Sequence, residues 1–254
     1  MPNPFVSKYN ITPYDPKMKP EPILWAVEDI WQLGKINAMG GFEKSGKTRL
    51  MNWILTGTFG GSVLGGYALP RKTLYLCGEE RPADVNQRIT TYAKLQDVDL
   101  EKINITFMDA AGMRLDLPKE RKGLFDTIVE GDYHFLIIDP LRRVHGADED
   151  KSKDMSKVYN DFRHWSNKFN LTMVILHHTP KIGIDTDMTR IASWFRGSTD
   201  LPAILDTAQY VSRGKFSTDS KDRYDIKLYR QGRFPPMEPL MIVDGGDEKG
   251  FDLV

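Results

Sequence analysis

The sequence contains a single cysteine, no excess of charge of either sign and no long apolar run. Because Cys77 has no second cysteine to pair with, an intrachain disulfide and a zinc site built from cysteines are excluded. Lys and Arg together number 35, as do Asp and Glu, so the formal net charge is zero and no domain-wide basic field attracts nucleic acid. Binding to nucleic acid must therefore use local patches or form across subunits.

The most apolar windows have the length of a strand and fall short of the roughly 18 residues that a membrane-spanning helix needs. The first residues also lack the apolar core of a signal peptide. We therefore expect a soluble, cytoplasmic protein without a membrane partner.

The length of 254 residues suits one α/β domain with a full core. Residues 1–22 contain six prolines, which favour an extended chain over a packed fold. We predict a Pro-rich N-terminal arm over residues 1–22 and one α/β domain over residues 23–254.

From residue 35 on, short apolar runs alternate with stretches of helical spacing. Strands are predicted at residues 35–39, 73–77, 103–108, 135–138 and 173–176, and helices at 49–55, 83–95, 119–130 and 154–170. Three more strands, at 208–211, 224–229 and 239–243, follow without a helix between them. The predicted fold class is α/β, a mostly parallel sheet with helices on both faces and antiparallel strands at its C-terminal edge.

The stretch Gly41–Thr48 reads G-x-x-x-x-G-K-T, the phosphate-binding P-loop pattern, and lies between a predicted strand and a predicted helix. Glycine lets backbone N–H groups approach phosphate oxygens and adopts the positive φ angles that the loop needs. Lys47 is expected to reach the β- and γ-phosphates of ATP, and Thr48 to bind Mg²⁺ through its hydroxyl. The residues predicted to bind the nucleotide are Gly41, Glu43, Lys44, Ser45, Gly46, Lys47, Thr48 and Arg49.

Carboxylates follow two predicted strands, where P-loop chemistry needs them. Asp139 ends the apolar run 135–138 in the Walker B form and is expected to hold Mg²⁺ through water, the alternative being an Asp that caps a helix. Glu79 and Glu80 follow the strand 73–77, whose carboxyl end should face the ligand crevice. Glu79 is the first candidate for the catalytic acid that orients or deprotonates water, and Glu80 is the second. The alternative is an acidic pair at the start of a helix.

His177 and His178 end the next buried strand. Adjacent side chains on a strand point to opposite faces, so the pair is poorly placed to chelate one metal ion. Beside a γ-phosphate, either histidine suits a hydrogen-bonded sensor of the nucleotide, and a structural role is the alternative.

Two polar loops leave the same predicted sheet edge and carry cations that can hold a nucleic-acid backbone, namely Arg142, Arg143, Lys151, Lys181 and Arg190. The alternative is a pair of solvated loops. Lys227 and Arg230 lie on a late strand, and a cation that reaches a neighbouring subunit's γ-phosphate stabilises the charge of the transition state. Arg230 is the first choice for this catalytic role and Lys227 the second, although an ordinary surface strand would look similar.

Taken in order, these motifs resemble the RepA-type branch of the RecA-like P-loop ATPases, which includes plasmid and phage replicative helicases. The resemblance spans residues 23–243 and rests on Gly41–Thr48, Gly78-Glu79-Glu80 with Arg88-Ile89, Asp139-Pro140-Leu141, Glu149-Asp150, His177 to Lys181 and Arg196-Gly197-Ser198. It implies a RecA-like core and a homo-oligomeric ring, often a hexamer, with ATP between subunits. By resemblance Asp139 is the Walker B acid, Glu79 the catalytic acid and His178 the sensor, whereas Lys227 and Arg230 match the trans-acting cations only loosely. Glu80 and Asp150 stand where the family more often has Asp and Asn.

The leading hypothesis is an oligomeric ATP-dependent DNA motor, a phage or plasmid replicative helicase that translocates on single-stranded DNA, in the host cytoplasm if it is phage-encoded. The same motifs also allow a RecA-like ATPase that binds single strands in recombination or loading without unwinding. A small-molecule P-loop kinase is disfavoured because we find no clear lid and because the tail is built of antiparallel strands. The expected cofactors are ATP and Mg²⁺, and the expected partners are further copies of the chain and single-stranded DNA.

Overall fold

The computed structural model describes residues 13–147, 152–180, 188–195, 200–215, 224–232, 237–246 and 249–253. Within these residues nine strands form one sheet in the order β13-β12-β11-β10-β3-β9-β8-β6-β7. Their bounds are β3 (Ile36–Gly41), β6 (Thr73–Cys77), β7 (Ile105–Asp109), β8 (Phe135–Asp139), β9 (Thr172–His178), β10 (Thr207–Lys215), β11 (Tyr224–Gly232), β12 (Met237–Asp244) and β13 (Phe251–Leu253).

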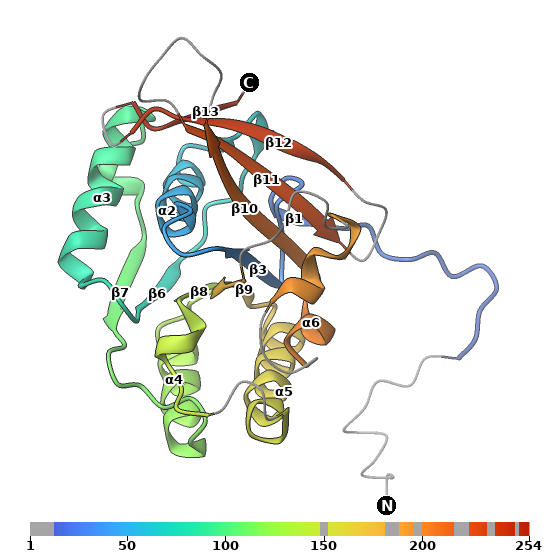
Figure 1. Ribbon diagram of the computed structural model, residues 1–254. Helices are drawn as coiled ribbons and strands as arrows, with labels where there is room; N and C mark the ends of the chain where they lie inside the picture. The colour runs from blue at the N-terminus through green and yellow to red at the C-terminus, as the bar shows by residue number, and fades with distance from the viewer. Residues whose placement is uncertain are drawn as a thin grey trace, which may run out of the picture.

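The strands from β10 to β7 run parallel, and those from β10 to β13 pair antiparallel (Figure 1). In the parallel part, Gly41 of β3 pairs with His178 of β9, and Cys77 of β6 pairs with Asp139 of β8. The carboxyl ends of these strands therefore meet at one edge of the sheet. The prediction of a mostly parallel sheet with antiparallel strands at its C-terminal edge is confirmed.

Helices cover both faces of the sheet (Figure 1). The helices α2 (Lys47–Gly57) and α3 (Pro82–Leu95) lie on one face, and α4 (Pro118–Glu130) and α5 (Ser152–Phe169) lie on the other. Alternate side chains of the parallel strands belong to two separate cores, so that Ile137 of β8 lies in the first core and Ile138 in the second. Because both faces are covered, every residue of β8 is buried, which accounts for its continuous apolar run.

Several short elements were not predicted, because they span too few residues to show a period. They are β1 (Trp25–Val27), β2 (Trp31–Gln32), β4 (Ser62–Val63), β5 (Gly66–Tyr67), β13, α6 (Asp200–Ile204) and the 3₁₀ turns η1 (Leu100–Lys102), η2 (Leu141–Arg143) and η3 (Met188–Trp194). Of these, η2 matters for the site, because it follows β8 directly at the edge where the parallel strands end.

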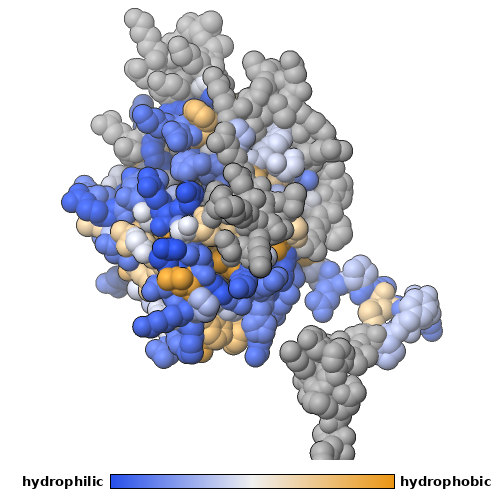
Figure 2. Space-filling model, turned by 60° about the horizontal axis from the view of Figure 1, so that its bottom comes forward, coloured by the Kyte–Doolittle hydropathy of each residue, from blue (hydrophilic) through white to orange (hydrophobic). Residues whose placement is uncertain are grey.

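Residues 13–24 contain neither a helix nor a strand, and Tyr14 and Leu24 are 90% and 59% exposed. Residues 1–12 lie outside the described residues, so the boundary between arm and domain stays a prediction. In the part of the chain that is described, no helix has the length and apolarity needed to cross a membrane. Among the described residues on the face turned forward in Figure 2, hydrophilic side chains predominate and hydrophobic ones are scattered among them.

Candidate active site

The loop between β3 and α2 has the backbone conformation that a phosphate-binding loop requires. Lys44 and Gly46 both have positive φ angles, 58° and 88°. At Gly41 a Cβ atom would lie 2.7 Å from Ser45 Oγ and 2.8 Å from the carbonyl oxygen of Val211, so only glycine fits there. The helix α2 begins at Lys47, directly after the loop, and directs its N-terminal amides and positive dipole end toward this loop.

Two buried polar groups inside the loop fit a phosphate ligand. Lys47 is 6% exposed, and its Nζ donates to the carbonyl oxygens of Gly41 and Phe42, each at 3.0 Å. Burial lowers the pKa of Lys47 to about 8, although the nearby Asp139 carboxylate opposes the shift. Ser45 Oγ is buried and has no hydrogen-bond partner among the described residues. A phosphate would give both groups a charged acceptor.

Asp139 lies at the end of β8 and is 8% exposed. Thr48 donates to its Oδ1 at 3.2 Å, and the hydroxyl of Tyr75 donates to its Oδ2 at 2.6 Å. Burial raises the pKa of Asp139 to about 6, against the lowering effect of these two hydrogen bonds. On the neighbouring strand, burial raises the pKa of Cys77 to about 12, so the single thiol of the chain stays neutral.

Thr48 and Asp139 supply a hydroxyl and a carboxylate oxygen, which are donors that Mg²⁺ prefers. Among the described residues no group of three or more His, Cys, Asp or Glu side chains is arranged to hold a metal ion by itself. Mg²⁺ is usually bound through one or two carboxylates together with waters and substrate phosphates, and the pair of Thr48 and Asp139 matches that donor set. The predicted pair of Mg²⁺ residues is therefore brought together, while its role stays a prediction.

The two glutamates after β6 enter the same pocket but have different partners. The pocket has a volume of about 200 Å³, and its lining includes Lys47, Thr48, Glu79, Glu80, Asp139 and His178. Glu79 Oε1 accepts a hydrogen bond from Arg143 Nε at 2.9 Å and lies 4.0 Å from His178 Nε2. Glu80 Oε2 accepts one from Arg88 Nη2 at 2.6 Å. In the described part of the chain, Glu79 thus contacts Arg143, which follows β8, and approaches His178, the last residue of β9, whereas Glu80 pairs with Arg88 of α3.

The two histidines at the end of β9 point to opposite faces, as predicted. His178 continues the row of Val174 and Leu176, which belong to the α2 side of the sheet, and lines the pocket. His177 is 2% exposed and packs its ring on Phe195 at 5.9 Å between centroids. Burial and the positive charge of Lys47 lower the pKa of His178, so it is neutral at physiological pH.

The remaining predicted residues lie outside this cluster or outside the described residues. Arg142 and Arg143 are exposed on η2, whereas Lys181 lies outside the described residues and only the backbone of Arg190 is described.

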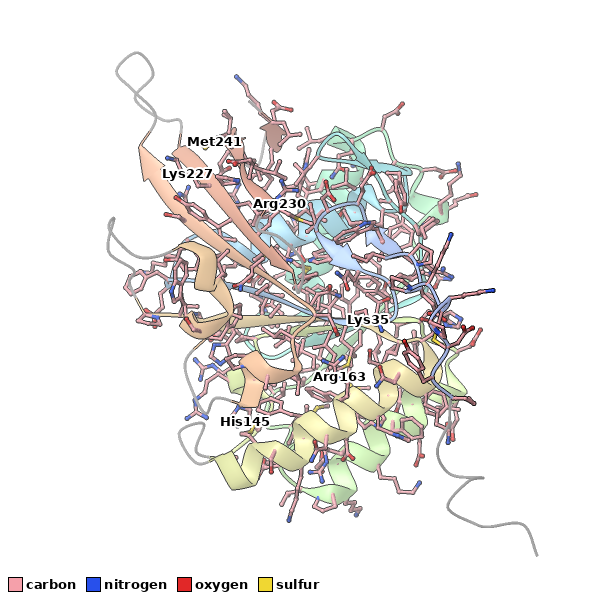
Figure 3. The ribbon with its side chains drawn as sticks, turned by 90° about the vertical axis from the view of Figure 1, so that its right-hand side faces the viewer. Lys35, His145, Arg163, Lys227, Arg230 and Met241 are labelled. Carbon is pink, nitrogen blue, oxygen red and sulfur yellow. The ribbon has the colours of Figure 1, made fainter. Side chains whose placement is uncertain are left out.

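The first candidate for a trans-acting cation, Arg230, donates to the carbonyl oxygen of Glu238 from Nε at 3.2 Å and from Nη2 at 2.6 Å. The exposed Lys227 lies earlier on β11, nearer the amino end of that strand, which pairs with the carboxyl end of β10 (Figure 3). The contacts of Arg230 are thus within its own chain, and the identity of a trans-acting cation stays a prediction.

Two residues predicted to bind the nucleotide lie at the margin of the pocket, where Arg49 is part of the lining and Glu43 is not, and their role stays a prediction. Arg49 forms a two-point ion pair with Asp244 of β12, with N–O distances of 2.9 and 3.2 Å, and its guanidinium lies 5.4 Å from the centre of the Phe251 ring. Glu43 is exposed on the loop. Sequence reasoning missed Tyr75 altogether. The available signal was a tyrosine inside an otherwise apolar buried strand, since a buried hydroxyl usually has a hydrogen-bond partner.

Comparisons with known proteins agree with this architecture. Residues 13–183 match the sequence profile of a family described as an AAA domain. A search of curated proteins finds no match. The KaiC-like protein PH0186 from the hyperthermophilic archaeon Pyrococcus horikoshii OT3 has a TM-score of 0.58 and 13% identity, over 92% of this chain and 100% of that chain. The ATPase domain of G40P has a TM-score of 0.63 and 11% identity, over 87% of this chain and 84% of that chain. These likenesses confirm the predicted RecA-like fold.

Proposed function

The chain belongs to the family of AAA domains that its residues 13–183 match, and we propose that it is an ATP-driven motor on single-stranded DNA. Its fold is that of a RecA-like P-loop ATPase, and the family implies nucleotide binding. The proposed motor assembles as a homo-oligomeric ring and serves as a phage or plasmid replicative helicase.

The chemistry proposed for the pocket is hydrolysis of ATP. Lys47 and the loop amides bind the phosphates, and Thr48 with Asp139 holds Mg²⁺, which neutralises charge on the phosphates when it is bound. Glu79 orients a water and accepts its proton, for which its half-exposed carboxylate is accessible. Neutral His178, 4.0 Å from Glu79, acts as a hydrogen-bonding group beside the same water.

The contact between Arg143 and Glu79 is the observation that carries the DNA part of the proposal. Arg143 was predicted to bind a nucleic-acid backbone and Glu79 to catalyse hydrolysis, yet the two side chains form one ion pair at 2.9 Å. Their side chains are 60% and 42% exposed, and such exposed pairs contribute only about 0–1 kcal/mol. A guanidinium also binds phosphate in a two-point geometry. A DNA phosphate that engages Arg143 would therefore release Glu79 for its catalytic role.

The ring is supported by the exposure of the catalytic side chains. Glu79 and His178 have side chains that are 42% and 35% exposed, so the pocket is open to solvent on the side of the candidate base. Closing an active site expels bulk water, which strengthens the electrostatic interactions inside the site and thereby favours hydrolysis of ATP. A second subunit placed over this side would supply that closure, and mass measurement of the protein with a non-hydrolysable ATP analogue tests for it.

The experiment that tests the proposal is ATP hydrolysis by the wild-type protein and by Glu79→Gln, each with and without single-stranded DNA. We expect DNA to raise the wild-type rate severalfold, and the variant to lose about 10²–10⁴-fold in rate because its amide cannot accept the proton. Binding of a fluorescent ATP analogue should be unchanged in the variant, which serves as the control for folding.

A forked duplex separates the possible outcomes. Strand displacement together with DNA-stimulated turnover supports the helicase. Stimulation without displacement would replace it with an ATPase that binds or loads single strands. A wild-type rate that DNA leaves unchanged would overturn the DNA motor altogether.

A further inference from the structure

Tyr75 lies in the middle of β6 and reaches across to the neighbouring strand β8. It is 0% exposed and belongs to the core on the α2 and α3 side of the sheet. In the register of the two strands Tyr75 is opposite Ile137, and Cys77 is opposite Asp139. The long side chain therefore runs diagonally, past one register pair, to place its hydroxyl 2.6 Å from Asp139 Oδ2.

The tyrosine ring is buried and packs against an aromatic ring of the next strand. Its centroid lies 5.8 Å from that of Phe107 on β7, at an interplanar angle of 47°. Its hydroxyl is fully desolvated, so the hydrogen bond to Asp139 cannot be exchanged for one to bulk water. A bond of this length between a hydroxyl and a carboxylate is in the range of charge-assisted hydrogen bonds.

The two oxygens of Asp139 consequently have different surroundings. Oδ2 accepts a hydrogen bond from the Tyr75 hydroxyl on the core side, and Oδ1 accepts one from the Thr48 hydroxyl at 3.2 Å. A space of about 10 Å³, near the size that one water needs, lies beside them and is lined by Thr48, Tyr75, Glu79, Glu80 and Asp139 among others.

We infer that Tyr75 is a positioning residue, which fixes the Asp139 carboxylate so that Oδ1 is presented to the magnesium ion of the bound nucleotide. The inference rests on the proposed ATP and Mg²⁺ chemistry but not on the proposed action on DNA. Partners that orient a metal-binding carboxylate commonly change metal affinity by about 10–100-fold when they are removed. Such an effect should appear in Mg²⁺ binding and leave the phosphate-binding loop untouched.

The test is the affinity of Tyr75→Phe for a fluorescent ADP analogue, measured over a range of Mg²⁺ concentrations and also without Mg²⁺. The substitution removes the hydroxyl and keeps the ring. Without Mg²⁺, we expect the affinity of the variant for the ADP analogue to equal that of the wild type. The Mg²⁺ concentration that produces half of the Mg²⁺-dependent change in this affinity should rise about tenfold. Thermal unfolding of the nucleotide-free variant shows that it is folded.

The matched control is Tyr92→Phe, which removes a hydroxyl from another buried tyrosine of the same core, one that packs on Trp53 and Phe251. It should leave the Mg²⁺ dependence unchanged. A Tyr75→Phe protein with the Mg²⁺ dependence of the wild type, or with an equal loss of affinity with and without Mg²⁺, would overturn the inference. If the affinity of the wild-type protein for the ADP analogue does not depend on Mg²⁺, the assignment of Thr48 and Asp139 as the Mg²⁺-binding residues is overturned as well. DNA-independent turnover, by contrast, would leave this inference standing while the proposed motor fails.

Discussion

The floor and the rim of the pocket are built in different ways. The floor, formed by Lys47, Thr48, Tyr75 and Asp139, is largely buried and is held by hydrogen bonds to the backbone and between side chains. The rim, formed by Glu79, Arg143 and His178, is partly exposed and is held by one ion pair and one longer contact.

This difference indicates two tasks. Burial of Lys47 and Asp139 opposes their charged forms, so the floor stores unfavourable free energy that phosphate and Mg²⁺ would relieve. The rim contacts are inexpensive to break, which suits side chains that change partners during a reaction cycle. We therefore expect substitutions in the floor to change the binding of phosphate and Mg²⁺ and the stability of the protein, and substitutions in the rim to change the rate of hydrolysis and its response to DNA.

Among substitutions in the floor, the largest effect is expected for Lys47→Ala. Loss of a buried cation at the phosphates should lower the rate of ATP hydrolysis by at least about 10²–10³-fold, as removal of a preorganised electrostatic group typically does. The measurement is steady-state turnover, with circular dichroism to show that the fold is intact. The control is Lys35→Ala, which removes an exposed cation directly before β3, at the end of that strand opposite to the phosphate-binding loop. A Lys47→Ala protein that hydrolyses ATP at the wild-type rate would refute the site.

A smaller effect is expected for Asp139→Asn in the absence of Mg²⁺ and nucleotide. The pKa of Asp139 is raised from 3.8 to about 6 by burial, so the folded protein keeps a proton that the unfolded chain has already lost. The free energy of unfolding should therefore fall as the pH rises from about 4 to about 6, and it should stay lower above that range. Two pKa units correspond to about 3 kcal/mol, which is the upper limit of the stability that the variant gains at neutral pH.

Urea unfolding of both proteins at several pH values checks this difference, which should vanish near pH 4, roughly where the unfolded chain also holds the proton. Asp116 provides a contrast of opposite sign, because Arg114 hydrogen bonds hold its pKa below the usual range. Asp116→Asn should destabilise the protein at neutral pH, and this loss should shrink as the pH falls below about 4. If Asp139→Asn instead destabilises the nucleotide-free protein at neutral pH, the claim that burial of the Asp139 carboxylate stores unfavourable free energy in the floor is wrong.

Much of the floor could be predicted from the sequence, because local patterns determine it. The P-loop spacing places Lys47 and Thr48 at a helix start, and the end of a buried strand places Asp139 beside them once the sheet is parallel. Glu79 and His178 reach the pocket by the same rule, since the carboxyl ends of parallel strands share an edge.

The partners of these residues could not be predicted, because they depend on the order of strands and on side-chain rotamers. That Tyr75 reaches Asp139 requires β6 and β8 to be neighbours in one particular register. That Arg143 pairs with Glu79 requires the turn after β8 to fold back over the end of β6. The ion pair of Arg49 with Asp244 joins residues 195 positions apart, so no local sequence pattern predicts it.

The central claim is that Glu79 becomes free for catalysis when Arg143 leaves their ion pair. Its most direct test is the rate of ATP hydrolysis by Arg143→Ala without DNA. Arg142→Ala is the matched control, because it removes a neighbouring exposed cation from the same turn and leaves the ion pair of Glu79 in place. We predict that Arg143→Ala hydrolyses ATP severalfold faster than the wild type without DNA and gains little when DNA is added, while Arg142→Ala keeps the low basal rate. A basal rate of Arg143→Ala equal to or below that of the wild type would contradict the account.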